Sequence, residues 1–253
     1  MLKLFIQISI PCLDAQLYCM HIRKQLNSSR GFFMQSPMTA SVVQTDERIS
    51  FLGKTYGMMA LCIAAGSAGA YFSMGLAFPY EHPFMMLFAM IGGIFAVQAM
   101  RHIAGVNLIA LLGFGALTGM AIAPLVGIVS AKSDILVTQA FMTTAVSFVA
   151  LTGYVFYSRK DFSFLKGFVW TGLIALIVLS LSNYFFFESG VVQLTVSGMG
   201  VLLFSAFILY DTSNILRDYP SNEFISAALT LYLDVFLLFQ NLLAMFGMLG
   251  GDD

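Results

Sequence analysis

Charged residues are scarce in this sequence. Only 10% of its 253 residues are Asp, Glu, Lys or Arg, while 59% are apolar. A soluble domain carries about 25% charged residues, and a water-soluble fold of this length would need that polar surface to cover itself. The shortage of charge excludes an ordinary soluble domain and predicts that lipid covers much of the protein.

Residues that commonly bind metals or act as nucleophiles are also scarce. The chain has three cysteines and three histidines: Cys12, Cys19, Cys62, His21, His82 and His102. An odd number of cysteines without metal-type spacing indicates neither a disulfide framework nor a metal centre. No nucleophile and base can be paired, so we expect no enzyme activity and no cofactor. The net charge of -1 argues against a nucleic-acid partner.

Long apolar runs dominate what remains. A transmembrane helix needs roughly 20 mostly apolar residues, and we searched for such runs bounded by charge, proline or glycine. Seven fit, at residues 55–78, 83–100, 106–129, 136–157, 165–187, 191–216 and 224–249. Their connections are too short for a soluble domain. We therefore predict an all-α integral membrane protein, with residues 51–253 forming one bundle of seven transmembrane helices.

The distribution of basic residues predicts the orientation in the membrane, because short loops rich in Lys and Arg stay in the cytoplasm. Leaving aside the first 47 residues, seven basic residues precede the first span or follow the second, fourth and sixth: Arg48, Lys54, Arg101, Arg159, Lys160, Lys166 and Arg217. On the opposite side, only Lys132 lies in a loop between spans. The N-terminus is therefore expected inside and the C-terminus outside, in the cell (inner) membrane.

The first 50 residues differ from the rest in composition. An apolar run at residues 2–13 is interrupted by polar residues and a proline, and it is too short to span a bilayer. It also lacks the small-residue cleavage site of a signal peptide. We interpret residues 1–50 as a disordered cytoplasmic tail. The alternative is that the true start of the protein lies at Met34 or Met38.

Two aspartates are the most informative residues. Of the 13 acidic residues, only Asp211 and Asp234 fall well within predicted spans. An aspartate at the centre of a membrane helix opposes insertion by about 2.5 to 3.5 kcal/mol, so such acids usually mark an ion or proton path. Both lie toward the cytoplasmic ends of the last two spans, which a short loop joins. Two neighbouring carboxylates in a low dielectric cannot both ionise cheaply, so the pair is expected to share a proton.

Arg101 is a candidate third member of this site. It lies at the cytoplasmic end of the second span, where its long side chain could reach an ionised aspartate. A plainer interpretation is a topology anchor whose charge reaches back to the membrane surface. If the three residues meet, protonation decides whether the carboxylates bind each other or the arginine. This arrangement would be a two-state switch that links pH to helix position.

Helical spacing gives Asp234 a polar stripe. Ser226, Thr230, Asp234 and Asn241 follow one another at intervals of 4, 4 and 7 residues in the last span. These intervals stack side chains along one face of a helix. Ser226, Thr230 and Asn241 could line a hydrated pore, or they could hydrogen-bond neighbouring helices, which is common in membranes.

Glycines interrupt the third span at Gly113, Gly115 and Gly119, and Pro124 follows them. In a membrane helix such an interruption indicates either a hinge or a close contact with another helix. The sequence is compatible with either a hinge or a close contact.

Three stretches of the sequence resemble the Bax inhibitor family, also known as the transmembrane Bax inhibitor motif family, and especially its bacterial YetJ-like and YccA-like members. They are residues 159–165 (RKDFSFL), residues 208–212 (ILYDT) and residues 231–243, which begin LYLD and end NLL. The likeness extends over about residues 51 to 253. It implies a seven-helix fold in which the last helix is central.

The resemblance also implies a function. Members are described as pH-sensitive calcium leak channels with a diaspartyl sensor near the cytoplasmic mouth, and Asp211 and Asp234 stand at the motif positions of that pair. Arg101 looks like the arginine that exchanges contacts with the sensor. Ca²⁺ and protons are then the expected partners, with transient Ca²⁺ contacts at the two aspartates. An acidic residue that some bacterial members carry in the second span is replaced here near Met90.

Our leading hypothesis is therefore a pH-regulated passive leak for cations, most plausibly Ca²⁺, whose oxygen ligands the carboxylates supply. The alternative is a regulatory membrane protein that binds a membrane protease, as YccA-like members are held to do, and the polar N-terminal tail would suit that role. A proton-coupled transporter comes third, because the sequence shows neither an inverted repeat nor paired broken helices.

Overall fold

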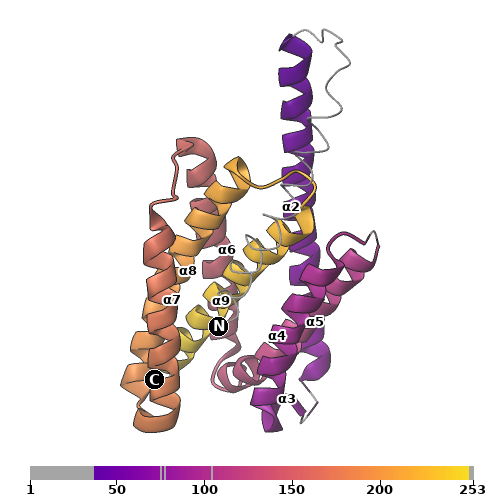
Figure 1. Cartoon of the computed structure of the whole chain (residues 1–253). Coiled ribbons are helices and arrows are strands. Elements are labelled where there is room, and N and C mark those ends of the chain that lie inside the picture. The colour runs from indigo at the N-terminus through magenta and orange to yellow at the C-terminus, as the bar shows by residue number, and fades with distance from the viewer. Residues whose placement is uncertain (1–36, 75, 77, 104, 251–253) are drawn as a thin grey trace.

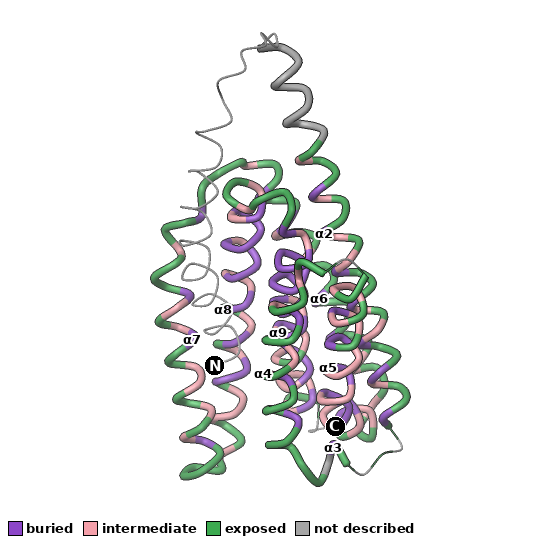
Figure 2. Tube along the Cα trace, turned by 45° about the vertical axis from the view of Figure 1, so that its right-hand side comes forward, coloured by how far each residue is buried: buried purple, intermediate pink, exposed green. Residues whose placement is uncertain are grey.

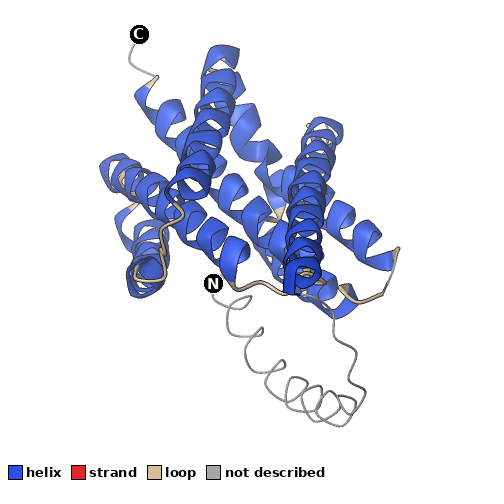
Figure 3. Cartoon of the chain, turned by 90° about the horizontal axis from the view of Figure 1, so that it is seen from above, coloured by secondary structure: helices blue, strands red, loops and turns tan. Residues whose placement is uncertain are grey.

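The computed structural model describes residues 37–74, 76, 78–103 and 105–250. Within these residues every regular element is a helix, as the view from above in Figure 3 shows. Seven of the helices are long and apolar enough to cross a membrane. The predicted all-α membrane architecture is confirmed. Most of the predicted tail, with the candidate start at Met34, lies outside the described residues.

The helices follow one another along the chain with short connections (Figure 1). They are α2 (Pro37–Ser73), α3 (Phe78–Glu81), α4 (Pro83–Met100), α5 (Val106–Ser130), α6 (Asp134–Ser158), α7 (Leu165–Ser182), the π-helical turn η1 (Asn183–Phe187), α8 (Gly190–Arg217) and α9 (Phe224–Leu249). The predicted spans from the second onward agree with these bounds to within about two residues at each end, and α7 with η1 makes up the fifth.

The first span is where the predicted boundaries were wrong. We predicted residues 55–78, whereas α2 runs from Pro37 to Ser73 and its membrane-spanning part is Glu47–Ser73. A search for apolar runs ends a span where charged residues begin. The helix itself does not end there, because its backbone hydrogen bonds can continue into water. At the other end, Leu76 N donates to Ser73 O at 3.0 Å in a turn that separates α2 from α3. Residues 37–50 of the predicted tail therefore belong to α2.

Helix α9 occupies the middle of the bundle. It contacts α2, α5, α6 and α8, while α7 packs mainly against α8. The buried share of its most apolar stretch, 56%, exceeds that of the other spans, and Figure 2 shows the buried positions gathered on α8 and α9. The acid and amide that it carries, Asp234 and Asn241, would be costly against lipid, so a central position suits this helix. The prediction that the last helix is central is confirmed.

Helices α2 and α5 approach each other along a seam of glycines, which we call the glycine seam: Gly66, Gly69, Gly115 and Gly119. A Cβ atom on Gly119 would collide with the carbonyl oxygen of Gly66, and one on Gly69 with the backbone of Ala116. Small residues permit this backbone contact between membrane helices. For Gly115 and Gly119 the close-contact interpretation is confirmed, whereas a Cβ on Gly113 would meet nothing within 4 Å.

The central helix is tied to the glycine seam by a hydroxyl pair. Thr118 Oγ1 donates to Gly115 O at 2.7 Å and also hydrogen-bonds the buried Tyr232 hydroxyl of α9. Replacing Tyr232 by phenylalanine is expected to lower the free energy of unfolding by about 1 kcal/mol, because this hydrogen bond is lost and nothing replaces it. Reversible unfolding in mixed micelles measures the change. Tyr71→Phe, at an exposed position, is the control, and an equal effect in both variants would contradict the assignment.

Candidate functional site

The polar side chains of interest gather at one end of the bundle. Helices α4, α6 and α8 end there and α9 begins there, so Arg101, Arg159, Lys166 and Arg217 all lie at this end, which we call the basic end. Lys132 lies at the opposite end and donates from Nζ to Gly247 O at 2.8 Å. The asymmetry predicted from the sequence is thus a feature of the folded bundle.

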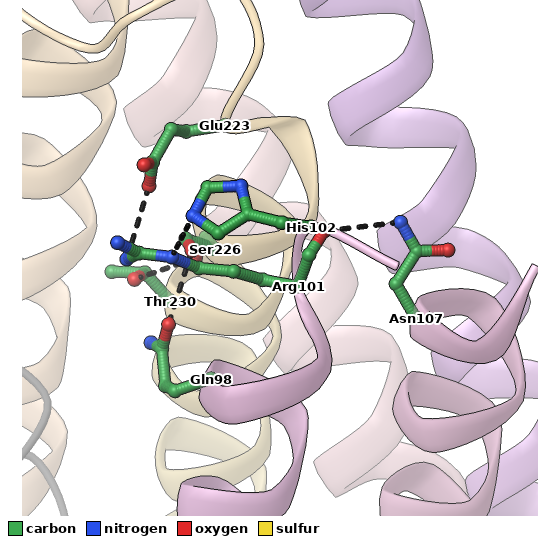
Figure 4. Close-up of polar contacts among 7 residues, drawn as sticks. All are labelled: Gln98, Arg101, His102, Asn107, Glu223, Ser226 and Thr230. Carbon is green, nitrogen blue, oxygen red and sulfur yellow. Dashed lines mark hydrogen bonds and ion pairs between the residues drawn. The ribbon is translucent and has the colours of Figure 1, made fainter. Parts of the chain in front are cut away.

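Arg101 forms an ion pair with Glu223 at the basic end (Figure 4). Its Nη1 lies 3.2 Å from Glu223 Oε2, and the two side chains are only 11% and 8% exposed. Arg101 Nε also donates to His102 Nε2 at 2.9 Å, and Asn107 Nδ2 donates to Arg101 O at 3.1 Å. The arginine is therefore held at the end of α4 by contacts on two sides.

Glu223 immediately precedes α9. A carboxylate at this position also interacts favourably with the positive end of the helix dipole. The ion pair therefore connects the end of α4 to the start of the central helix, which contacts α2, α5, α6 and α8.

A second connection between α4 and α9 lies one turn deeper. Ser226 Oγ donates to Gln98 Oε1 at 3.1 Å, and Thr230 Oγ1 donates to Ser226 O at 2.9 Å. Ser226 and Thr230 are both buried. Ser226, the first residue of the predicted polar stripe, thus faces α4, and Thr230 is bonded within α9 itself. Whether they line a pore stays a prediction.

Tyr219, in the connection between α8 and α9, joins this cluster. Burial of its hydroxyl holds the pKa of Tyr219 well above the usual value. Smaller contributions come from the carboxylates of Asp211 and Glu223, which raise the pKa, and from Arg101 and a hydrogen bond with Thr230, which lower it. Of these side chains, Thr230 is the hydrogen-bond partner of the phenol.

Arg48 fixes the same connection from the side of α2. Its Nη1 donates to Tyr219 O at 2.6 Å, and its Nη2 donates to Ile215 O at 3.3 Å. The last carbonyl groups of a helix lack partners within the helix, and an arginine can satisfy them. Helix α2 is thereby attached to the end of α8.

The two aspartates lie deeper, in α8 and α9. Asp211 is 1% exposed and Asp234 is fully buried, and their helices pack directly on each other. Both side chains are therefore inside the bundle, as an acid that avoids lipid must be. A buried carboxylate is costly unless a cation, a hydrogen bond or a proton accompanies it. Their role as a paired sensor, and as transient Ca²⁺ contacts, stays a prediction.

Asn241 lies farther along α9, toward the opposite end. Its Nδ2 donates to Leu237 O of the same helix at 2.7 Å, and its side chain fills the space left by the missing Cβ of Gly200 on α8. These are the contacts of a residue at a helix-packing interface, one of the two interpretations given for it.

Glu223, Gln98 and Tyr219 were not identified from the sequence. Glu223 could have been found from the sequence. It lies 3 residues before Ser226, so helical spacing places it on the same face as the polar stripe, at the end where α9 begins. We searched for acids only inside the apolar spans, and Glu223 stands just before one. Gln98 and Tyr219 gave no such signal, since only tertiary contacts bring them to the cluster.

The described residues contain no group of three or more His, Cys, Asp and Glu side chains placed to hold a metal ion. Asp211 and Asp234 could offer a passing cation carboxylate oxygens, which is a contact of a different kind from a resident centre.

Fold and site together define a seven-helix membrane protein with two buried acids in its core and an arginine–glutamate pair at one end of its central helix. Residues 48–251 match the sequence model of the family described as inhibitor of apoptosis-promoting Bax1. The chain belongs to this family, the Bax inhibitor family, as its motifs suggested.

Its relatives span bacteria and eukaryotes. The chain is 37% identical to an uncharacterized protein of Pseudomonas aeruginosa, over 87% of this chain and 98% of the relative. It is 33% identical to an uncharacterized membrane protein of Vibrio cholerae, over 87% and 100%. It is 34% identical to Bax inhibitor 1 of Schizosaccharomyces pombe, over 81% and 79%.

Proposed function

We propose that this protein is a pH-regulated passive pathway for cations, Ca²⁺ above all, with its basic end in the cytoplasm of a cell whose inner membrane it spans. The observation that carries the proposal is the burial of Asp211 and Asp234 in two adjoining helices at the centre of the bundle. Acids so placed are expensive in a membrane and mark ion or proton paths.

The polar cluster at the basic end supplies a gate for that path. Arg101 stands at its mouth with Glu223, and Thr230 lies one turn before Asp234 on the same face of α9. Protonation of the aspartates removes negative charge from the core and weakens its attraction for Arg101. Deprotonation strengthens that attraction and sets the aspartates in competition with Glu223. Each change of partner moves the end of α4 relative to α9, which opens or closes the mouth.

The mechanism involves no chemical step on a substrate. The proposal therefore includes no enzyme activity and no cofactor, and its partners are the lipid bilayer, protons and the permeant ion.

A second candidate function is regulation of a membrane partner such as a protease. The observation in its favour is that α2 begins at Pro37 and extends beyond the other helices at the basic end (Figure 1). A helix that continues past the bundle on the cytoplasmic side would give a partner a place to bind.

Ca²⁺ flux into proteoliposomes tests the first candidate. We expect the wild-type flux to change with pH between about pH 6 and pH 8, the range in which such switches operate. A switch governed by one proton changes its open-to-closed ratio by up to about tenfold per pH unit. Asp211→Asn and Asp234→Asn should each flatten this dependence, because neither amide can titrate.

Asp218→Asn is the matched control, since Asp218 is an exposed acid at the same end of α8, and it should keep the wild-type profile. An unchanged pH dependence in both buried-aspartate variants would remove the sensor role. Absence of flux at every pH, together with co-purification of a membrane protease, would favour the regulatory function instead.

A further inference from the structure

A cavity of about 460 Å³ lies between α2, α5, α6 and α9, in the half of the bundle away from the basic end. It is lined by the last third of α2 and the residue after it, from Ile63 to Met74, by α5 from Gly119 to Val126, and by α6 from Val137 to Val149. The turns of α9 around Val235 complete it. We call this cavity the lateral groove.

The groove opens sideways rather than along the bundle axis. On its inner side, Tyr232 and Phe236 of α9 are 3% and 8% exposed, so they form a floor. On its outer side, Tyr71 of α2 and Phe141 and Val149 of α6 are 74%, 52% and 68% exposed, so they form a rim. This rim lies within membrane-spanning helices. Whatever enters the groove must therefore come from the bilayer.

The residues that line the groove do not require a polar occupant. None of its residues is charged. Three of its four hydroxyl groups are engaged within the protein: Ser67 Oγ donates to Ile63 O at 3.0 Å, Thr144 Oγ1 donates to Ala140 O at 2.7 Å, and the Tyr232 hydroxyl bonds Thr118. The fourth belongs to Tyr71 at the exposed rim. Water is unfavourable in an apolar cavity of this kind, which accepts apolar ligands instead.

Charged residues lie next to the groove at the end of the bundle opposite the basic end, where Lys132 and Asp134 stand near the start of α6. Asp134 is exposed in the first turn of α6, one turn before the lining residue Val137. Its carboxylate suits the amine of a zwitterionic phospholipid headgroup at the membrane surface, while the uncharged groove below it suits a hydrocarbon chain. The arrangement has the polarity of a lipid, with a charged end outward and an apolar end inward.

We propose that the lateral groove is a binding site for one acyl chain of a phospholipid from the leaflet opposite the basic end. The volume of the groove falls in the range of roughly 300 to 1,000 Å³ typical of small-molecule sites. The occupant contacts Val235 and Phe236, which directly follow Asp234 on α9. Lipid in the groove therefore touches the turn of the central helix that carries the buried acid. The site does not depend on the proposed ion flux, because binding requires only the groove.

Quenching of tryptophan fluorescence by brominated acyl chains tests the proposal. The chain has a single tryptophan, Trp170, so a Trp170→Phe background allows one reporter at a time. Phe236→Trp places the reporter at the floor of the groove. Phe168→Trp, at 59% exposure, reports the lipid-facing surface, and Phe204→Trp, at 2% exposure, reports a buried site elsewhere.

In vesicles of phosphatidylcholine with brominated chains, the Phe236→Trp reporter should lose a fraction of its fluorescence close to that lost by Phe168→Trp. The Phe204→Trp reporter should lose almost none. If the Phe236→Trp and Phe204→Trp reporters are equally protected, no acyl chain reaches the floor and the proposal is wrong. Protection accompanied by dimer formation would assign the groove to a second copy of this chain, and would equally overturn it.

Filling the groove provides a measurement that does not need a reporter in the core. Ala145 lines the groove, whereas Ala150 is an exposed alanine on the same helix outside it. Native mass spectrometry should show that Ala145→Phe loses a phospholipid that the wild type and Ala150→Phe both retain. Equal retention by the three proteins would overturn the proposal even if the core reporter did not fold.

Discussion

Gly119→Ala is expected to lower the free energy of unfolding by about 1 to 3 kcal/mol, the usual cost of overpacking a tightly packed site. The added methyl group would collide with Gly66 O and come within 2.9 Å of Ala70 N, both in the backbone of α2. A side chain could relieve the collision by changing its rotamer, but the backbone of a helix cannot. The helices α2 and α5 must therefore move apart. The intrinsic helix preference of alanine over glycine, about 1 kcal/mol, offsets only part of this cost.

Gly113→Ala is the matched control for this prediction. Gly113 lies in the same helix, and a Cβ there would meet nothing within 4 Å. Its replacement should leave stability unchanged or raise it by up to about 1 kcal/mol through helix preference alone. Unfolding in mixed micelles compares the two variants. If both alanines were stabilising, the glycine seam would not be a close contact between α2 and α5.

Arg101→Met should destabilise the protein by about 3 kcal/mol or more. Removing one partner of a buried ion pair leaves the other charge in a poorly solvated place, and such losses are typically about 3 to 5 kcal/mol. Glu223, at 8% side-chain exposure, would be left without the cation 3.2 Å away. Methionine keeps much of the length of arginine, so the change removes charge more than volume.

The double variant Arg101→Met with Glu223→Met separates the ion pair from the packing. Replacing both partners by apolar groups avoids an isolated charge, so the double variant should be more stable than Arg101→Met alone. Lys166→Gln, at an exposed basic residue of the same end, should change stability by no more than about 0.5 kcal/mol. Strictly additive effects of the two methionines would mean that the pair contributes no coupling.

The number and placement of the spans could be predicted because each depends on local composition. Residues 224–249 were assigned to the last span from hydropathy alone, and α9 has the same bounds. The start of α2 could not be found in this way. Residues before Glu47 are too polar to indicate membrane, and the sequence gives no boundary between a helix inside the bilayer and its continuation in water.

Buried acids could be identified from the sequence, but their surroundings could not. Asp211 and Asp234 are conspicuous because they interrupt apolar runs, and helical periodicity gave Asp234 its polar neighbours. The partner of Ser226 is Gln98, 128 residues away in the chain, and no local pattern connects them. The lateral groove was equally unpredictable, because a cavity depends on how four helices pack and not on any one of them.

The length of α2 gives the bundle a mechanical property. Its 37 residues form one helix of about 55 Å, against roughly 30 Å of hydrocarbon in a bilayer. Its last third is both a wall of the lateral groove and, at Gly66 and Gly69, the partner of α5 in the glycine seam, while Arg48, nearer its other end, attaches it to the end of α8. The helix is thus a rigid strut between the groove on one side of the membrane and the end of α8 on the other. A shift of α2 along its axis would therefore reach the groove, the glycine seam and the end of α8 together.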